Sequence, residues 1–186
     1  MKTSSFLRLA LLSAAALLTH AAFAAKPGPN PQPPPPSSGT LVLDYDPAGL
    51  YAENYGLTIT PSGTIYSSGT VDWRGVVLAS SDGGITWTGP LDLLTTNSHA
   101  RAIFAHPTAG IFAAGTRGGA WVVRRSTNGG AIWSDVDTLQ LSTRSASEAN
   151  ADYTEPHAMA ADASASLFVG GTGWDASGAH WIIKRY

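Results

Sequence analysis

Tryptophans stand next to carboxylates at two places in this sequence. Asp72 and Trp73 form one pair, and Trp174 and Asp175 form the other. Sugar rings have apolar C–H faces and polar edges, so an aromatic plane beside a carboxylate suits carbohydrate binding. Such residues also cap the ends of strands, and the sequence leaves both roles open.

Cleavage of a glycoside would place further demands on the carboxylates. Two carboxyl groups would have to lie about 5–10 Å apart across the scissile bond. The candidate carboxylates are Asp72, Asp152, Glu155 and Asp175. The sequence gives no distance between them, so it leaves open whether the protein is an enzyme. The histidines lack a shared ligand spacing, and we expect no metal site and no cofactor.

An internal repeat determines where these residues are expected to lie. Residues 63–70 resemble residues 109–116 and 165–172. The aromatic residue of the first copy is Tyr66, and the aromatic residue recurs 46 residues later and then after another 56 residues. Aligning the three copies by this aromatic brings one set of residues to an equivalent position at the start of each copy. These residues are Tyr55, Arg101 and His157. They would present a phenol, a cation and an imidazole to one site.

Each copy carries short apolar runs separated by turn residues, which is typical of strands. In the second copy the expected strands are residues 102–105, 111–114, 121–125 and 131–136. Four short strands in 40 to 60 residues fit one blade of a β-propeller. The sequence therefore predicts an all-β fold with about three blades, over residues 56–94, 102–141 and 158–186.

A second motif joins two of the expected strands. Residues 80–87 read Ser-x-Asp-x-Gly-x-Thr-Trp, with Ser80, Asp82, Gly84, Thr86 and Trp87 at the defining positions. An aspartate can accept hydrogen bonds from backbone N–H groups of a tight turn, and glycine tolerates positive φ there. We therefore expect a hairpin.

The motif recurs 46 residues later. Ser126, Asn128, Gly130 and Trp133 match it, with Asn128 in place of aspartate and Ile132 in place of threonine. Asparagine keeps the short polar side chain that such turns need. This pattern resembles the Asp-box, or BNR repeat, of sialidases and related β-propellers.

The resemblance implies a partial Asp-box propeller, with the boxes as structural turns away from the ligand face. It places at that face the residues Tyr55, Trp73, Arg101, His157, Trp174 and Asp175. A sialidase would also carry an Arg-Ile-Pro motif, which is absent, and three arginines that grip a carboxylate. The arginines expected near the ligand face are Arg74, Arg101 and Arg117.

The ends of the chain have different compositions. Residues 1–25 combine a basic start, an apolar run and Ala-x-Ala, which predicts a secretory signal peptide, with a short membrane anchor as the alternative. Residues 26–38 are a proline-rich linker, and residues 39–186 are the repeat domain. The segment 40–46 is either an ordinary lead-in strand or the outer strand of a closing blade.

These features lead to an expectation for function. The net charge of −2 and the lack of a basic run argue against binding to nucleic acid. We expect contact with a membrane only through the signal peptide. We expect a secreted or periplasmic binding or scaffold module for glycan or a cell-surface polymer. The alternative is the N-terminal portion of an exo-glycosidase with catalytic residues partly outside this chain. Open blade faces also predict self-association, so the chain is either a truncated propeller or a ring completed by oligomerisation.

Overall fold

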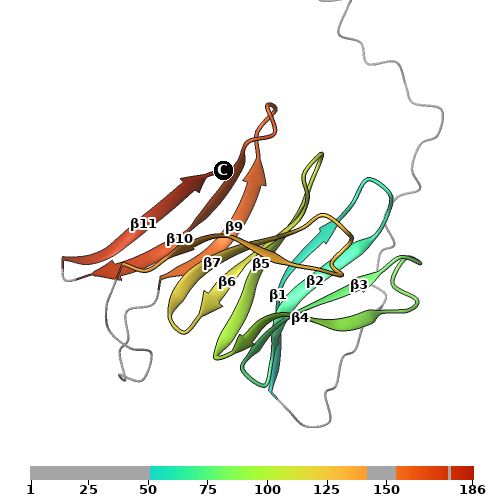
Figure 1. Cartoon of the computed structure of the whole chain (residues 1–186), viewed down its shortest axis with the longest axis horizontal. Helices are drawn as coiled ribbons and strands as arrows, with labels where there is room; N and C mark the ends of the chain where they lie inside the picture. Colours follow the sequence, from blue (N-terminus) through green and yellow to red (C-terminus); the bar gives the residue numbers. More distant parts are fainter. Residues whose placement is uncertain (1–50, 142–153, 176) are drawn as a thin grey trace, which may run out of the picture. The chain divides into compact units, whose positions relative to one another are not determined.

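The computed structural model describes residues 51–141, 154–175 and 177–186, which form three antiparallel sheets and, within these ranges, no helix (Figure 1). The first sheet contains β1 (Ala52–Ile59), β2 (Ile65–Val71), β3 (Arg74–Ser80) and β4 (Thr88–Thr96). The second contains β5 (Ser98–His106), β6 (Gly110–Arg117), β7 (Ala120–Ser126) and β8 (Ser134–Leu139). The third contains β9 (Glu155–Ala161), β10 (Leu167–Asp175) and β11 (Gly178–Arg185). The all-β prediction is confirmed.

Neighbours in the chain are neighbours in each sheet. The hydrogen-bonded order is β1-β2-β3-β4 in the first sheet, β5-β6-β7-β8 in the second and β9-β10-β11 in the third. The first three strands expected in the second copy are present, whereas the fourth begins at Ser134 rather than at residue 131. Ala131 and Ile132 still belong to the turn, because the backbone N–H of Ile132 is held by the side chain of Asn128. The predicted signal peptide, linker and 40–46 segment lie outside the described residues.

The strand register repeats from sheet to sheet. Thr70 pairs with Gly75 across β2 and β3, and Thr116 pairs with Trp121 across β6 and β7. Thr172 pairs with Trp181 in the same way across β10 and β11. The alignment made from the sequence is therefore present in three dimensions, and corresponding residues point to corresponding faces.

The second sheet buries both of its faces. On one face, Ile111, Ala113 and Val122 belong to a core cluster with Tyr66 and Val77 of the first sheet. On the other face lies a second cluster, made of residues from the second and third sheets. Its buried members are Phe112, Ala114, Trp121, Val123, Leu167 and Val169. Burial of these apolar faces is the main force that holds neighbouring sheets together.

Residues 80–87 form the expected hairpin turn. The carboxylate of Asp82 accepts hydrogen bonds from the backbone N–H of Thr86 at 2.9 Å and from its hydroxyl at 2.6 Å. The hydroxyl of Ser80 donates to Asp82 at 2.8 Å and accepts from the N–H of Gly84 at 2.8 Å. Gly83 and Gly84 have φ of 75° and 92°, which explains glycine at both positions.

The second turn repeats this arrangement with asparagine. Asn128 Oδ1 accepts from the N–H of Ile132 at 2.9 Å, and Ser126 Oγ accepts from the N–H of Gly130 at 2.9 Å. Trp133 Nε1 donates to the carbonyl of Gly130 at 2.9 Å, as Trp87 Nε1 does to that of Gly84 in the first turn. The prediction that Asn128 preserves the turn is confirmed.

The Asp82 turn should make the stability of the folded protein depend on pH under acidic conditions. Hydrogen bonds from the Thr86 hydroxyl and backbone lower the pKa of Asp82 to about 2. A carboxyl group with a lowered pKa stabilises the fold above its unfolded pKa, and this contribution is lost as the pH falls through the folded value. We therefore compare the free energies of unfolding of the native protein and of Asp82→Asn. The native protein should be the more stable of the two at pH about 5, and this difference should become smaller at pH about 2.

Denaturant unfolding of both proteins at each pH measures this difference. Asparagine is a suitable replacement because Asn128 occupies the same position in the second turn. The reverse change, Asn128→Asp, is the matched control and should introduce a similar but weaker dependence, since Ile132 has no hydroxyl to donate. An equal difference at both pH values would contradict this account of the turn.

Candidate functional site

A β-bulge lies at the same place in the first strand of every sheet. The pairing of β1 with β2 shifts between Asn54 and Gly56, so that Tyr55 is the extra residue. The corresponding shifts leave Arg101 as the extra residue in β5 and His157 in β9. Bulges re-aim side chains and are common beside binding sites. The predicted equivalence of these three positions is confirmed.

Three glycines explain why the bulges recur. Gly69, Gly115 and Gly171 lie opposite the bulges, on β2, β6 and β10. At each glycine, an added Cβ would overlap a backbone carbonyl oxygen of the first strand. The residues that carry these carbonyls are Glu53, His99 and Glu155, each two positions before the bulge residue. The close approach of the two backbones is therefore possible only with glycine, and it is the same in all three sheets.

Arg101 connects the first strands of the three sheets. Its guanidinium carbon lies 4.5 Å from the centre of the Tyr55 ring on β1, in a cation–π contact. Its Nη2 lies 3.3 Å from Oε1 of Glu155 on β9. The Nε of Arg101 is buried and has no hydrogen-bond partner, so the guanidinium keeps one donor unused.

Aromatic side chains extend this contact toward the turn between β2 and β3. His99 packs edge-on against the ring of Tyr55, with centroids 6.3 Å apart, and against that of Trp73, at 5.9 Å. Trp73 stacks on Tyr51 with centroids 5.4 Å apart and an interplanar angle of 16°. We call these residues together the Trp73–Arg101 cluster, which consists of Tyr51, Tyr55, Trp73, His99, Arg101 and Glu155.

Trp73 has an unusual backbone conformation. Asp72 and Trp73 have φ of 46° and 61°, in a region that bulky side chains seldom adopt. The equivalent turn between β6 and β7 uses Gly118 and Gly119, with φ of 60° and 85°. Trp73 is held there by the N–H of Ser98, which donates to its carbonyl at 3.0 Å. Strained positions of this kind cluster at binding sites, and the side chain of Trp73 is 56 % exposed.

Neighbouring groups set the protonation states of Glu53, Tyr55 and His99. Hydrogen bonds from Tyr51 and Tyr55 lower the pKa of Glu53, so this carboxylate is ionised at neutral pH. Burial, together with the hydrogen bond to Glu53, raises the pKa of Tyr55 and keeps its phenol protonated. Burial and the neighbouring Arg101 lower the pKa of His99, whose ring is therefore neutral at pH 7. The cluster, together with Glu53 beside it, thus offers a cation and two carboxylates beside aromatic planes.

The remaining predicted site residues lie elsewhere. His157 is exposed, and its Nε2 lies 3.1 Å from Oγ1 of Thr172. Trp174 and Asp175 lie at the end of β10, where Oδ1 of Asp175 is 3.0 Å from Nε2 of His180.

A serine completes this second group without forming a catalytic relay. Ser177 Oγ donates to Asp175 Oδ1 at 2.6 Å and lies 3.2 Å from His180 Nε2. The same imidazole nitrogen therefore faces both partners, whereas a relay needs one nitrogen for each. Hydrogen bonds from Ser177 and His180 lower the pKa of Asp175, which removes it as a proton donor.

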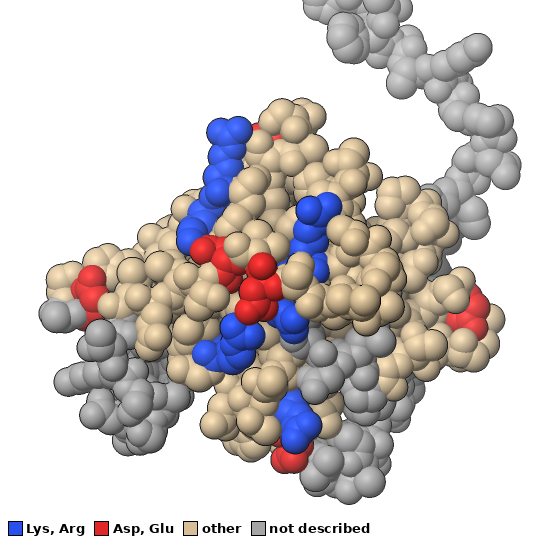
Figure 2. All heavy atoms as spheres, in the orientation of Figure 1, with Lys and Arg blue, Asp and Glu red and all other residues tan. Residues whose placement is uncertain are grey.

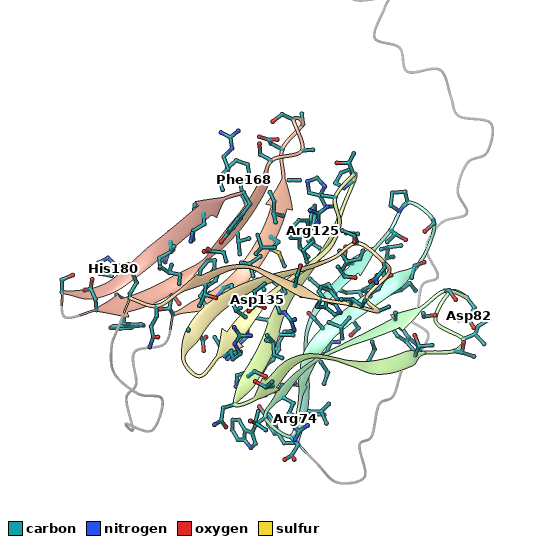
Figure 3. All side chains as sticks on the ribbon, viewed as in Figure 1. Arg74, Asp82, Arg125, Asp135, Phe168 and His180 are labelled. Atoms are coloured by element: carbon teal, nitrogen blue, oxygen red, sulfur yellow. The ribbon has the colours of Figure 1, made fainter. Side chains whose placement is uncertain are left out.

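Sequence reasoning missed Tyr51, Glu53 and His99. A signal for two of them existed, because Glu53 and His99 stand two residues before the equivalent Tyr55 and Arg101. Of the other arginines, Arg117 pairs with Asp135 at 2.8 Å, and Arg74 begins β3 directly after Trp73. Asp152 lies outside the described residues. Figure 3 shows Arg74 and Asp82 at opposite ends of β3, so the Asp82 turn lies away from the Trp73–Arg101 cluster.

Two features are absent from the described part of the chain. It contains no group of three or more histidine, cysteine, aspartate or glutamate residues that could hold a metal ion. No helix in that part is long and apolar enough to cross a membrane. On the face drawn in Figure 2, acidic and basic side chains lie intermixed.

Comparison of the chain with protein-family models, with curated proteins and with solved structures found no match.

Proposed function

We propose that this protein is an exported binding module of the Asp-box propeller type, which takes carbohydrate at the Trp73–Arg101 cluster. The three sheets would be successive blades, with β1, β5 and β9 as their inner strands. Their sequential strand order, repeated register and repeated turns support this arrangement. Export rests on the composition of residues 1–25.

One observation carries the ligand assignment. Trp73 keeps a large aromatic side chain exposed at a position of strained backbone, where the equivalent turn has glycine. Strain at such a position persists when the surroundings or the function demand it. The cluster also contains the ion pair of Arg101 and Glu155, and Glu53 is hydrogen-bonded to Tyr55. These charged side chains offer partners for hydroxyl groups. A sugar ring combines the apolar face and polar edge that such a site accepts.

We favour binding over hydrolysis at this site. Glu155 is engaged in an ion pair with Arg101. Hydrogen bonds from Tyr51 and Tyr55 lower the pKa of Glu53 and favour its ionised form. A glycosidase needs a carboxyl group that holds a proton for the leaving group. The alternative of an exo-glycosidase would therefore require an acid from outside this cluster.

Replacement of Trp73 by glycine tests the proposal without disturbing the turn. Gly119 shows that the equivalent position accepts glycine, so we expect an unchanged melting temperature. A glycan array probed with the full chain identifies the ligand, and titration calorimetry then measures Kd. We expect Kd to rise about tenfold or more in Trp73→Gly, equivalent to about 1.4 kcal/mol or more.

Trp174→Ala is the matched control, because Trp174 is also an exposed tryptophan at the end of a strand but does not belong to the cluster. It should leave Kd unchanged. Equal binding by the native protein and Trp73→Gly would refute the site, and a native protein that binds no glycan would refute the function.

A further inference from the structure

The contact between neighbouring sheets follows one rule. The bulge residue of one sheet meets the residue two positions before the bulge in the next. Tyr55 of the first sheet packs against His99 of the second, with ring centroids 6.3 Å apart. Arg101 of the second sheet pairs with Glu155 of the third at 3.3 Å. The bulge residue of the third sheet is His157. By this rule it would contact, in a following sheet, the residue equivalent to Glu155.

The third sheet leaves uncovered the face that the second sheet buries. Trp121 and Trp181 hold the same register position, opposite Thr116 and Thr172. Trp121 is 0 % exposed because the third sheet covers it, whereas Trp181 is 94 % exposed. Ile183, two residues along β11, points to the same side and is also exposed. Large exposed apolar side chains grouped on one face mark an interaction surface.

The first sheet leaves uncovered the opposite half of the same interface. Ile103 on β5 faces the first sheet and is 7 % exposed. Its counterpart on β1, Leu57, is 63 % exposed, and Ile59 beside it is exposed as well. Glu53 lies on this strand at the position equivalent to Glu155. The first and third sheets thus carry the two complementary halves of an interface that already occurs twice in this chain.

We propose that a second copy of this chain binds head to tail, with Trp181 and Ile183 of one copy packed on Leu57 and Ile59 of the other. His157 of one copy then faces Glu53 of the other, an imidazole against a carboxylate, as Arg101 faces Glu155 within the chain. Such a heterologous interface forms a ring when the rotation closes. Two copies supply six sheets, which lies within the roughly four to eight with which propellers close.

Light scattering coupled to gel filtration measures the mass of the full chain across a dilution series. We expect twice the monomer mass for the native protein and for Ile85→Asp, the control, because Ile85 is 83 % exposed but lies in the turn of residues 80–87. Trp181→Asp and Leu57→Asp should each halve the mass at the same concentration, with circular dichroism showing that both stay folded. A native protein that is monomeric throughout would overturn the proposal.

Chemical cross-linking tests the head-to-tail geometry separately. The chain has no cysteine, so His157→Cys and Glu53→Cys each carry a single reactive thiol. A short bis-maleimide should link the two variants when they are mixed and should link neither variant to itself. Linkage within either variant alone would indicate a symmetric face-to-face dimer instead. A dimer that gives no linkage in the mixture would equally exclude the head-to-tail contact.

Discussion

Replacement of Gly171 by alanine is expected to destabilise the protein by about 3 kcal/mol or more. An added Cβ would lie 2.7 Å from the Cα of Pro156 and 2.7 Å from Cζ3 of Trp121, and closer still to the carbonyl oxygen of Glu155. Backbone atoms on two strands cannot move apart without breaking the pairing of β9 with β10. The free energy of unfolding, obtained from denaturant titration, measures the effect.

Gly170 provides the control for this change. It is adjacent in the same strand, and the atom nearest to its added Cβ is the carbonyl oxygen of Ile182 at 4.0 Å. The corresponding residue of the second sheet is Ala114, so alanine suits this position. Gly170→Ala should therefore raise stability slightly, because alanine restricts the unfolded chain. Similar losses for the two variants would mean that the close approach opposite the bulge is unimportant.

Trp121→Ala is expected to lower the free energy of unfolding by about 3–5 kcal/mol. The side chain is fully buried between the second and third sheets, where it packs in one cluster with Val123, Leu167 and Val169. Its removal leaves a cavity that the rigid sheets can fill only in part. Since small domains have only about 5–15 kcal/mol of stability, we expect a large fall in the melting temperature.

Trp181→Ala is the matched comparison, since the two tryptophans have the same strand position and the same register partner. At a concentration where the chain is monomeric, this change should alter stability by less than about 0.5 kcal/mol, because Trp181 is almost fully exposed. A large loss for Trp181→Ala in the monomer, or a small one for Trp121→Ala, would contradict the arrangement of the sheets.

The Trp73–Arg101 cluster was only partly predictable. The repeat alignment correctly placed Tyr55 and Arg101 at one position, and tryptophan beside carboxylate drew attention to Trp73. The alignment also placed His157 at that position, and the resemblance to Asp-box propellers placed Trp174 and Asp175 on the same face. The described contacts of His157 and Asp175 are instead with Thr172 and His180. Equivalent residues in successive repeats lie at the same position of a strand, at a β-bulge, but each contacts a different neighbouring side chain. The neighbour decides whether the residue becomes part of a cluster.

The sequence by itself determined the turns and the repeated strands, because their causes are local. The hydrogen bonds of Asp82 reach only four residues along the chain, and the alternation of apolar residues sets which side each strand buries. Only the tertiary structure decided which side chains meet and which stay exposed. Arg101 and Glu155 are 54 residues apart, and Trp121 and Trp181 have the same local sequence pattern but opposite burial. The physical reason is that burial depends on whether another sheet lies against the strand, and no short stretch of sequence contains that information.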